Sequence, residues 1–233
     1  MRTRDDTIRE LLDADALDEA SLNLNLRDIR RINGLLGWRA FTVQAVVKEV
    51  RALRADTFSL IDVACGSADI PLAIARRAAR NHLTASIVAS DISPLIVAVA
   101  RKEAATTPSV TVERQDALAL PYPPATFDIA LCTLALHHFD PPNAVSLLRE
   151  MARVGRRVLV FDIQRAQLAY IGSVALVNLL AMHPMTRNDA PASVRRSYSA
   201  DELRDLAAQA GLREARVTAR FPYRLALTAA GSA

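Results

Sequence analysis

The stretch FSLIDVACGSAD, residues 58–69, decides the fold. Its first part, residues 58–64, is an apolar run with β-branched members, which is typical of a parallel strand covered on both faces. The small residues that follow, as far as Asp69, predict a tight turn that opens a helix. Such a turn leaves backbone amide groups free to bind a ligand. The stretch therefore predicts a strand, a ligand-binding turn and a helix in succession.

Strand and helix signals alternate from this stretch to the end of the chain. Further strands are predicted at residues 84–91, 109–114, 127–133 and 156–163, with helices at 69–80, 93–106 and 140–155. Ser93 and Asp140 stand directly before prolines, an arrangement that is typical of helix starts. Ser199 and Glu202 have capping-box spacing, and two strands at 214–219 and 222–228 have hairpin spacing. The alternation predicts an α/β fold with a doubly wound, mostly parallel, seven-stranded sheet that contains one antiparallel strand.

The sequence divides into a helical cap, residues 1–54, and a sheet domain, residues 55–233. In the cap, Ile29, Ile32 and Leu36 recur at helical spacing, and Asn33-Gly34 is a candidate break. Within the sheet domain, residues 164–198 form a long, less regular insertion that we expect to be the wall of a substrate site. Its most apolar part, residues 168–182, is too short to span a bilayer and predicts a buried helix or a pocket wall.

Composition and charge exclude several classes of function. Among 233 residues, 29 Lys and Arg face 25 Asp and Glu, and the net charge of +4 is scattered along the chain. With 5% aromatic residues there are few platforms for stacking bases, so we expect no nucleic-acid partner. The N-terminus has no targeting signal, and Cys65 and Cys132 make no disulfide framework, which predicts a cytoplasmic protein without stable membrane insertion. The lack of metal-ligand spacing predicts a metal-independent reaction, and the sequence leaves open whether the chain forms a homodimer.

Carboxylates stand at the ends of three successive predicted strands. Asp62 and Asp69 bracket the first turn, Asp91 ends the second strand, and Asp116 follows the third. Ligands of doubly wound sheets bind outside the carboxyl ends of the strands. Each acid alone could simply begin a helix or a turn, but the set predicts a site for a cationic ligand. The acidic turn would repel a pyrophosphate and lacks the G-x-G-x-x-G pattern, which excludes a nicotinamide-dependent oxidoreductase.

With these acids, the runs IDVACGSAD (61–69) and FDIALCTLALHHF (127–139) resemble class I, Rossmann-like S-adenosylmethionine-dependent methyltransferases. The similarity is greatest to the small-molecule group that includes quinone-biosynthesis methyltransferases, and it covers residues 58–163 well and the rest in outline. The cofactor that it implies is S-adenosylmethionine. The chain departs from the family pattern at Ala64 and Ala68, which replace the first and third glycines. Alanine is tolerated where φ stays negative, but it crowds the approach of the backbone to the cofactor, so a weakened cofactor site is the alternative.

The resemblance implies a set of cofactor-binding residues. They are Asp62, Ala64, Cys65, Gly66, Asp69, Asp91, Ile92, Asp116, Ala117, Thr133 and Leu134. In this set Asp62 would orient the methionine ammonium group, and Asp91 would hold the ribose with Ile92 stacked on the adenine. Asp116 and Ala117 would pair with the adenine edge.

His137 and His138 are the candidate catalytic residues. Methyl transfer is an in-line displacement, so the enzyme must place the nucleophile near the methyl carbon and, for an oxygen nucleophile, remove a proton. Histidine is a suitable base at neutral pH, although either ring could also serve only in packing. Because neighbouring residues point in different directions, we expect at most one of the two to face the substrate.

An apolar or aromatic small molecule is the predicted acceptor, because Leu and Met are frequent in the insertion. Candidate substrate-binding residues are Tyr170, Val174, His183, Arg195 and Tyr198. The predicted function is O- or C-methylation of a phenolic, quinone-like or polyketide-derived compound. An RNA or protein methyltransferase is one alternative, opposed by the sequence TLAL at 133–136 in place of an N-P-P-Y type tetrad. A non-catalytic binding protein is another, supported only by Ala64 and Ala68.

Overall fold

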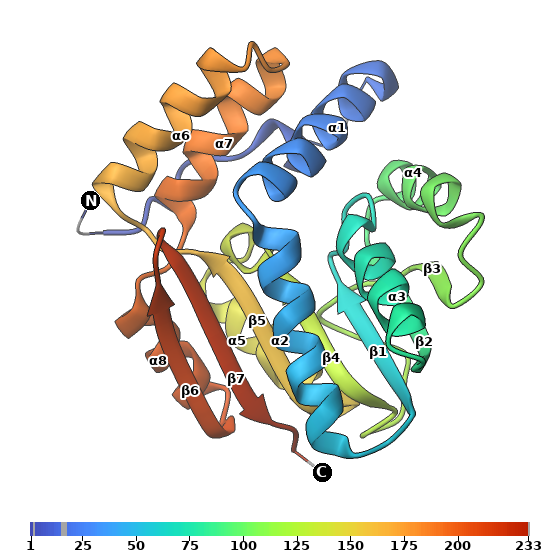
Figure 1. Ribbon diagram of the computed structural model, residues 1–233. Coiled ribbons are helices and arrows are strands. Elements are labelled where there is room, and N and C mark those ends of the chain that lie inside the picture. The colour runs from blue at the N-terminus through green and yellow to red at the C-terminus, as the bar shows by residue number, and fades with distance from the viewer. Residues whose placement is uncertain (2, 15–17, 233) are drawn as a thin grey trace.

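The sheet is the frame of the molecule (Figure 1), and the computed structural model describes residues 1, 3–14 and 18–232 of the chain. The strands are β1 (Thr57–Val63), β2 (Thr84–Asp91), β3 (Val110–Arg114), β4 (Phe127–Thr133), β5 (Gly155–Ile163), β6 (Arg213–Arg220) and β7 (Arg224–Ala230). They are ordered β3-β2-β1-β4-β5-β7-β6 in one seven-stranded sheet. β1 to β5 are parallel, and β7 runs antiparallel to both β5 and β6. The predicted α/β sheet with one antiparallel strand is confirmed.

Helices cover both faces of the sheet (Figure 1). They are α1 (Glu19–Leu35), α2 (Trp38–Leu53), α3 (Asp69–Arg80), α4 (Pro94–Ala104), α5 (Pro141–Val154), α6 (Gln167–Leu179), α7 (Pro184–Arg196) and α8 (Ala200–Gln209), with short 3-10 helices η1 (Leu11–Asp13) and η2 (Leu136–His138). One apolar core joins the sheet to α2, α3 and α4, and a second joins it to α5 and α8. Leu60 of β1 belongs to the first core and Ile61 to the second, as the pleat of a strand requires. This burial on both faces explains why the strand sequences are apolar throughout.

Local capping sets the helix starts that the sequence predicted. Ser93 accepts a hydrogen bond from a backbone amide at the start of α4, and Asp140 does the same at the start of α5. The capping box of Ser199 and Glu202 is formed at the start of α8. These three starts are confirmed, and α3 spans the predicted residues 69–80.

The N-terminal region differs from the prediction. Gly34 lies inside α1, and the break comes at Gly37, whose φ of 71° lies in the left-handed region that glycine adopts without strain. The predicted break at Asn33-Gly34 is wrong, because Asn33 is buried and its side-chain amide faces the carboxylate of Asp69 at 3.4 Å. Before α1, the described residues 3–14 are helical only in η1, which packs against α7.

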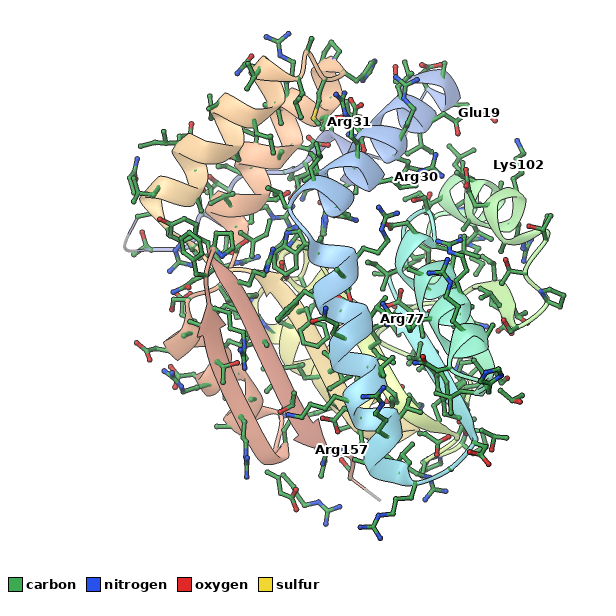
Figure 2. All side chains as sticks on the ribbon, in the orientation of Figure 1. Glu19, Arg30, Arg31, Arg77, Lys102 and Arg157 are labelled. Atoms are coloured by element: carbon green, nitrogen blue, oxygen red, sulfur yellow. The ribbon has the colours of Figure 1, made fainter. Side chains whose placement is uncertain are left out.

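α1 holds the cap against the rest of the molecule. On one side an apolar cluster joins α1 to α4, and Arg30 forms an ion pair of 2.5 Å with Glu103 beside it. Figure 2 labels Arg30 on α1 and Lys102 on α4. On the other side Asn25 donates a hydrogen bond to the hydroxyl of Thr186 in α7, at 3.2 Å. α1 therefore lies between α4, which begins at the carboxyl edge of the sheet, and α7, which ends there, where ligands of this architecture bind.

The insertion is more regular than expected, since it consists of α6 and α7 packed against each other (Figure 1). The prediction of a buried helix is wrong: in α6 only Val177 is buried, and Leu179 is 84% exposed. The other predicted role, a pocket wall, agrees with the cavity described below. None of the helices in the described ranges is long and apolar enough to cross a membrane.

Candidate active site

A cavity of about 810 Å³ lies at the carboxyl edge of the sheet. It is lined by the turn after β1, the end of β2 and the segment after β4, and by side chains of η1, α1, α6 and α7. Residues from the cap, the sheet and the insertion therefore meet around one space. The predicted site residues can be compared with this lining one by one.

Three buried carboxylates line one part of the cavity, which we call the acidic end: Asp62, Asp69 and Asp91. Asp91 is held by two backbone amides, those of Gly66 and Ser93, each 3.1 Å from a carboxylate oxygen. The carboxylate that ends β2 is thereby tied to the turn after β1. The ligand-binding turn and the acid of the next strand form one unit.

Asp62 is the least compensated of these acids. It is 2% exposed, and within the described residues its Oδ1 has no hydrogen-bond partner. Burial raises the pKa of Asp62 well above its usual value, and the charges of Asp69 and Asp91 raise it further. Burial also raises the pKa of Asp69 and of Asp91, against the effect of their hydrogen bonds. Because an uncompensated buried carboxylate is costly, the acidic end favours a cationic group on a ligand.

The turn after β1 has an unusual backbone. Ala64, Gly66 and Ala68 have positive φ angles of 55°, 55° and 59°. Alanine replaces glycine without strain only where φ is negative, and both alanines have positive φ. The backbone conformation of each alanine costs about 1–2 kcal/mol. At Gly66 a Cβ would meet no described atom within 4 Å, so the backbone there is open to the cavity. The turn permits the close approach of a ligand at Gly66.

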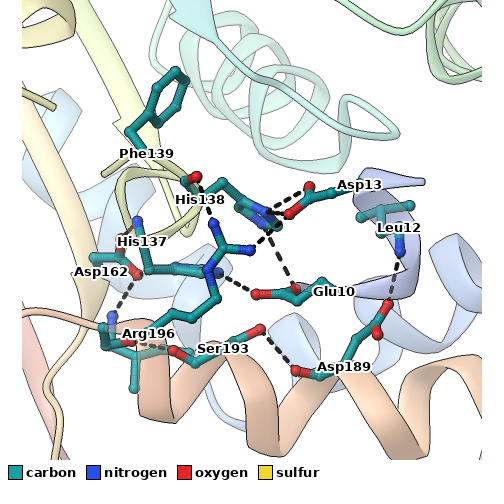
Figure 3. Close-up of polar contacts among 12 residues, drawn as sticks. Glu10, Leu12, Asp13, His137, His138, Phe139, Asp162, Asp189, Ser193 and Arg196 are labelled. Atoms are coloured by element: carbon teal, nitrogen blue, oxygen red, sulfur yellow. Dashed lines mark hydrogen bonds and ion pairs between the residues drawn. The ribbon is translucent and has the colours of Figure 1, made fainter. Parts of the chain in front are cut away.

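A second group of polar side chains, the histidine cluster, consists of Glu10, His137 and His138, which all line the cavity. Nδ1 of His137 lies 2.7 Å from a carboxylate oxygen of Asp162 in β5, and Nδ1 of His138 lies 2.9 Å from one of Asp13 in η1. The Nε2 atoms of His137 and His138 lie 3.7 and 3.8 Å from the carboxylate oxygens of Glu10 (Figure 3). η2 brings the two rings together, with centroids 4.5 Å apart, and both residues line the cavity. That at most one ring faces the substrate stays a prediction.

The acids around His138 stabilise its charged form. Burial alone would lower the pKa of His138, but the charge of Glu10 and the hydrogen bond that Nδ1 of His138 donates to Asp13 raise it to about 9. Burial likewise opposes the ionisation of Asp13, but His138 and Arg196 lower the pKa of Asp13 to about 2. Arg196 lies 2.8 Å from a carboxylate oxygen of Asp13 and donates to the carbonyl oxygen of His138 at 2.6 Å. The charged groups around the cluster therefore keep His138 protonated and Asp13 ionised near neutral pH.

Comparisons with known proteins agree with this geometry. Residues 60–158 match the family model described as a methyltransferase domain. The chain is 36% identical over 130 residues to a demethylmenaquinone methyltransferase of Deinococcus radiodurans, a match that covers 53% of this chain and 48% of that protein. A demethylmenaquinone methyltransferase of Thermobifida fusca is 30% identical over 162 residues, which are 66% of this chain and 65% of the relative. Residues 60–158 therefore carry a methyltransferase domain, and over this part the chain is similar to the class I, S-adenosylmethionine-dependent methyltransferases.

The likeness in fold extends further along the chain than the likeness in sequence. The chain spans about half the length of the first curated relatives it matches, 48% and 46% of them. The crystal structure of a SAM-dependent methyltransferase from Aquifex aeolicus superimposes with a TM-score of 0.62 over 92% of this chain and 98% of that one. Its sequence identity is 18%, so this likeness shows the fold alone. The family predicted from the sequence is confirmed.

Most of the cofactor residues that the resemblance implies lie around the acidic end. Those lining the cavity are Asp62, Ala64, Cys65, Gly66, Asp69, Asp91, Ile92, Thr133 and Leu134. Asp116 and Ala117 do not line it: Asp116 is exposed and accepts a hydrogen bond from the amide of Leu118 at 2.9 Å, and Ala117 packs in the second core. The unpartnered oxygen of Asp62 and the open backbone of Gly66 fit the ammonium group and the close approach of S-adenosylmethionine. The adenine contact of Asp116 and Ala117 stays a prediction.

The substrate wall of α6 is formed by different residues from those predicted. Tyr170 and Val174 do not line the cavity, whereas Leu168, Gly172 and Leu176 do. The lining residues are spaced four apart, so they share one face of the helix. Because apolar residues lie on several faces of α6, the sequence could not show which face is turned toward the cavity.

The three predicted substrate residues beyond α6 have structural roles outside the cavity lining. His183 caps α7 with its ring, and Arg195 pairs with Asp5 at 2.7 Å. Tyr198 is buried and donates a hydrogen bond to the carbonyl oxygen of Phe139 at 2.7 Å. These side chains hold the insertion and the N-terminal segment in place around the site.

Three residues of the histidine cluster and its surroundings were missed by sequence reasoning: Glu10, Asp13 and Asp162. Asp162 carries a usable signal, since it lies near the end of the fifth predicted strand, where ligand groups are expected. Glu10 and Asp13 carry no such signal, because the segment that places them beside the histidines, residues 3–14, is mostly irregular. Arg4 fixes this segment by donating to two carbonyl oxygens after β4, each at 2.9 Å, and Asp189 accepts hydrogen bonds from two amides of η1 and its flank at 2.8 and 3.1 Å.

Proposed function

We propose that this protein transfers a methyl group from S-adenosylmethionine to a small acceptor molecule. One observation carries the proposal: a single cavity joins an acidic end, the histidine cluster and an apolar face of α6. A cationic donor and an apolar acceptor can thus meet in one place, as an in-line displacement requires. The methyltransferase domain that residues 60–158 match supports the same reaction.

The donor would bind at the acidic end. When bound, S-adenosylmethionine supplies a methyl group on a sulfonium centre, and the departing thioether is neutral. Asp62, with its unpartnered oxygen, would accept a hydrogen bond from the ammonium group. Asp91, which two amides hold in place, would accept hydrogen bonds from the ribose hydroxyls. The open backbone at Gly66 would allow the donor to approach closely.

For the acceptor we propose a phenolic, quinone-like or polyketide-derived ring that is methylated on oxygen or carbon. The relatives named demethylmenaquinone methyltransferases support a quinone-like ring. The apolar side chains of Leu168, Leu176 and Val177 on the α6 wall suit such a ring. The cavity, at about 810 Å³, also falls within the range of about 300–1,000 Å³ that is usual for small-molecule sites.

The histidine cluster would handle the proton of the acceptor. In O-methylation the acceptor oxygen forms a bond to the methyl carbon, the carbon–sulfur bond breaks, and its electron pair stays on sulfur. The hydroxyl proton must leave as this bond forms. His137, oriented by Asp162, would accept this proton, and the charged ring of His138 would stabilise the negative charge that develops on the acceptor oxygen.

Methyl transfer to a panel of phenols and hydroquinones tests the proposal. Methyl-labelled S-adenosylmethionine should label at least one of these compounds and should label neither RNA nor protein. His137→Ala and His138→Ala, assayed at saturating donor, should lower kcat by about 10²-fold or more, because a positioned base is lost in the first and a stabilising charge in the second. His82→Asn, in the loop before β2, is the matched control and should keep the wild-type kcat. Labelled RNA or protein, or donor binding without any labelled product, would contradict the proposal.

Two wider properties also remain proposals. On the grounds of composition, we propose a cytoplasmic location and no nucleic-acid partner. Cell fractionation measures the location, and light scattering measures whether the chain forms a homodimer. Neither result would alter the chemistry proposed for the cavity.

A further inference from the structure

We propose that Glu10, His137 and His138 bind a divalent transition-metal cation such as Zn²⁺ or Fe²⁺. Each of these residues offers one ligand atom, and the three atoms lie within 4.8 Å of one another. All three side chains line the cavity, so the cation would lie beside the proposed acceptor position. Imidazole and carboxylate are the ligands that such cations prefer, and two histidines with one carboxylate are a recurring set.

The distances within the cluster fit a shared cation better than direct hydrogen bonds. The Nε2 atoms of His137 and His138 lie 3.7 and 3.8 Å from the oxygens of Glu10, beyond the length of a hydrogen bond. Ligand atoms that each lie about 2.0–2.2 Å from one cation are separated from each other by about 3–4 Å. The three ligand atoms, which all lie within 4.8 Å of one another, therefore surround a gap that a small inward shift of the side chains would fit to one cation.

Carboxylates behind the two rings hold them in the orientation that metal binding needs. Nδ1 of His137 is paired with Asp162 at 2.7 Å, and Nδ1 of His138 is paired with Asp13 at 2.9 Å (Figure 3). A ring whose Nδ1–H donates to a carboxylate presents the lone pair of Nε2 on its other side. Such carboxylate–histidine pairs are the usual support of metal-binding histidines. Both rings in the cluster have this support.

Glu10 provides the independent sign that a ligand belongs in the gap. Its side chain is 3% exposed, and its Oε1 has no hydrogen-bond partner within the described residues. A buried carboxylate oxygen without a partner is uncommon and costly. A cation bound between Glu10 and the two rings would satisfy it.

The charge around the cluster also favours a cation. Glu10 belongs to the cluster, and three further carboxylates lie around it, those of Asp13, Asp162 and Asp189. Among the described residues, two guanidinium groups lie beside it: Arg196 pairs with Asp13, and Arg4 pairs with Asp6 while donating to the carbonyl oxygen of His137. An excess of buried negative charge attracts a dication, and a proton is the competing occupant that the experiment must distinguish.

The three ligands would leave coordination positions open toward the cavity, as catalytic metal sites do. An acceptor hydroxyl or quinone oxygen could bind there, and a cation would lower the pKa of a bound hydroxyl. In the metal-loaded protein this effect would replace proton removal by the histidine rings, because their Nε2 atoms would be ligands. This last step depends on the proposed function, whereas binding of the cation does not. The two can therefore fail separately.

Titration of chelator-treated protein with Co²⁺ and with Zn²⁺ tests the proposal, without any assay of activity. Wild-type protein should bind one cation saturably, with visible Co²⁺ absorption bands and with calorimetric heat for Zn²⁺. Glu10→Gln should weaken binding by more than about 10-fold, and Asp162→Asn, which removes only the support of His137, by about 10–100-fold. His82→Asn, a histidine change outside the cluster, should bind as the wild type does.

Donor binding provides the control for folding and for the proposed function. Glu10→Gln should keep wild-type affinity for S-adenosylmethionine, and Asp91→Ala, which weakens the donor site, should keep wild-type affinity for Co²⁺. Absence of saturable Co²⁺ and Zn²⁺ binding by the wild type, or equal affinity in Glu10→Gln, would overturn the metal site. Methyl transfer that continues in such a protein would leave the proposed function intact.

Discussion

Single residues of the acidic end are destabilising until a ligand compensates them. Asp62 is buried with an unpartnered oxygen, and burial raises its pKa well above the usual value. A carboxyl group whose pKa is higher in the folded than in the unfolded state stabilises the fold only while it is protonated. That contribution is present at low pH and is lost as the pH rises through the pKa of the folded protein. The ligand-free protein therefore carries a cost at Asp62 that grows with pH.

Asp62→Asn removes this cost, so it should raise the stability of the ligand-free protein and weaken the binding of the ligand. We expect the variant without ligand to gain on the order of 1–3 kcal/mol in the free energy of unfolding at high pH, because a buried charge without a partner is gone. The gain should shrink as the pH falls and Asp62 becomes protonated. Denaturant unfolding at several pH values measures it, and calorimetry should show weaker binding of S-adenosylmethionine. A variant that is less stable than the wild type at high pH would contradict the uncompensated charge.

The strained alanines of the turn give a second prediction at this scale. Ala64→Gly and Ala68→Gly should each stabilise the protein by on the order of 1 kcal/mol, because glycine adopts positive φ without strain. Ala125→Gly is the matched control, since Ala125 has a φ of 54° but does not line the cavity. All three should raise the melting temperature, and only the turn variants should change the affinity for S-adenosylmethionine. An unchanged melting temperature in all three would mean that positive φ costs these alanines nothing.

At the scale of elements, α6 presents chemically similar residues to different surroundings. Leu176 lines the cavity, whereas Leu179 is 84% exposed. Leu176→Ala should raise KM for the acceptor, on the order of 10-fold for the loss of about 1–2 kcal/mol of apolar contact. Leu179→Ala, the matched control, should leave KM and stability within about 0.5 kcal/mol of the wild type. Steady-state kinetics with a labelled acceptor check both, and equal effects would refute the assigned face of α6.

The sequence predicted the elements best where local chemistry alone defines them. The strand at 84–91 and the helix at 69–80 have the predicted bounds, because an apolar run and a tight turn are sufficient signals. The acids of the acidic end could be predicted to lie together for the same reason, since they stand at or just after the ends of strands. The break between α1 and α2 was misplaced because two glycines compete there, and only packing shows that Gly34 stays helical. Tertiary contacts decide which face of α6 lines the cavity, and they place Glu10 beside the two histidines. The periodicity of the sequence does not encode these contacts.

On the scale of the whole molecule, the cap and the insertion convert an open sheet edge into one cavity. α1 contacts both α4 and α7, and the segment before it brings Glu10 to the histidines that follow β4. The residues around the cavity therefore come from both ends and the middle of the chain. This arrangement explains why a site that is scattered in sequence can offer an acidic end to a donor and an apolar wall to an acceptor.

The central claim is that the acidic end holds a cationic nucleoside donor, and calorimetric titration with S-adenosylmethionine tests it most directly. We predict saturable binding to the wild type and a loss of about 1–3 kcal/mol, or about 5- to 150-fold in Kd, for Asp91→Ala, which removes charge-assisted hydrogen bonds. Asp201→Ala, an exposed acid in the first turn of α8, should bind as the wild type does. No saturable binding to the wild type, or an unchanged Kd in Asp91→Ala, would contradict the claim.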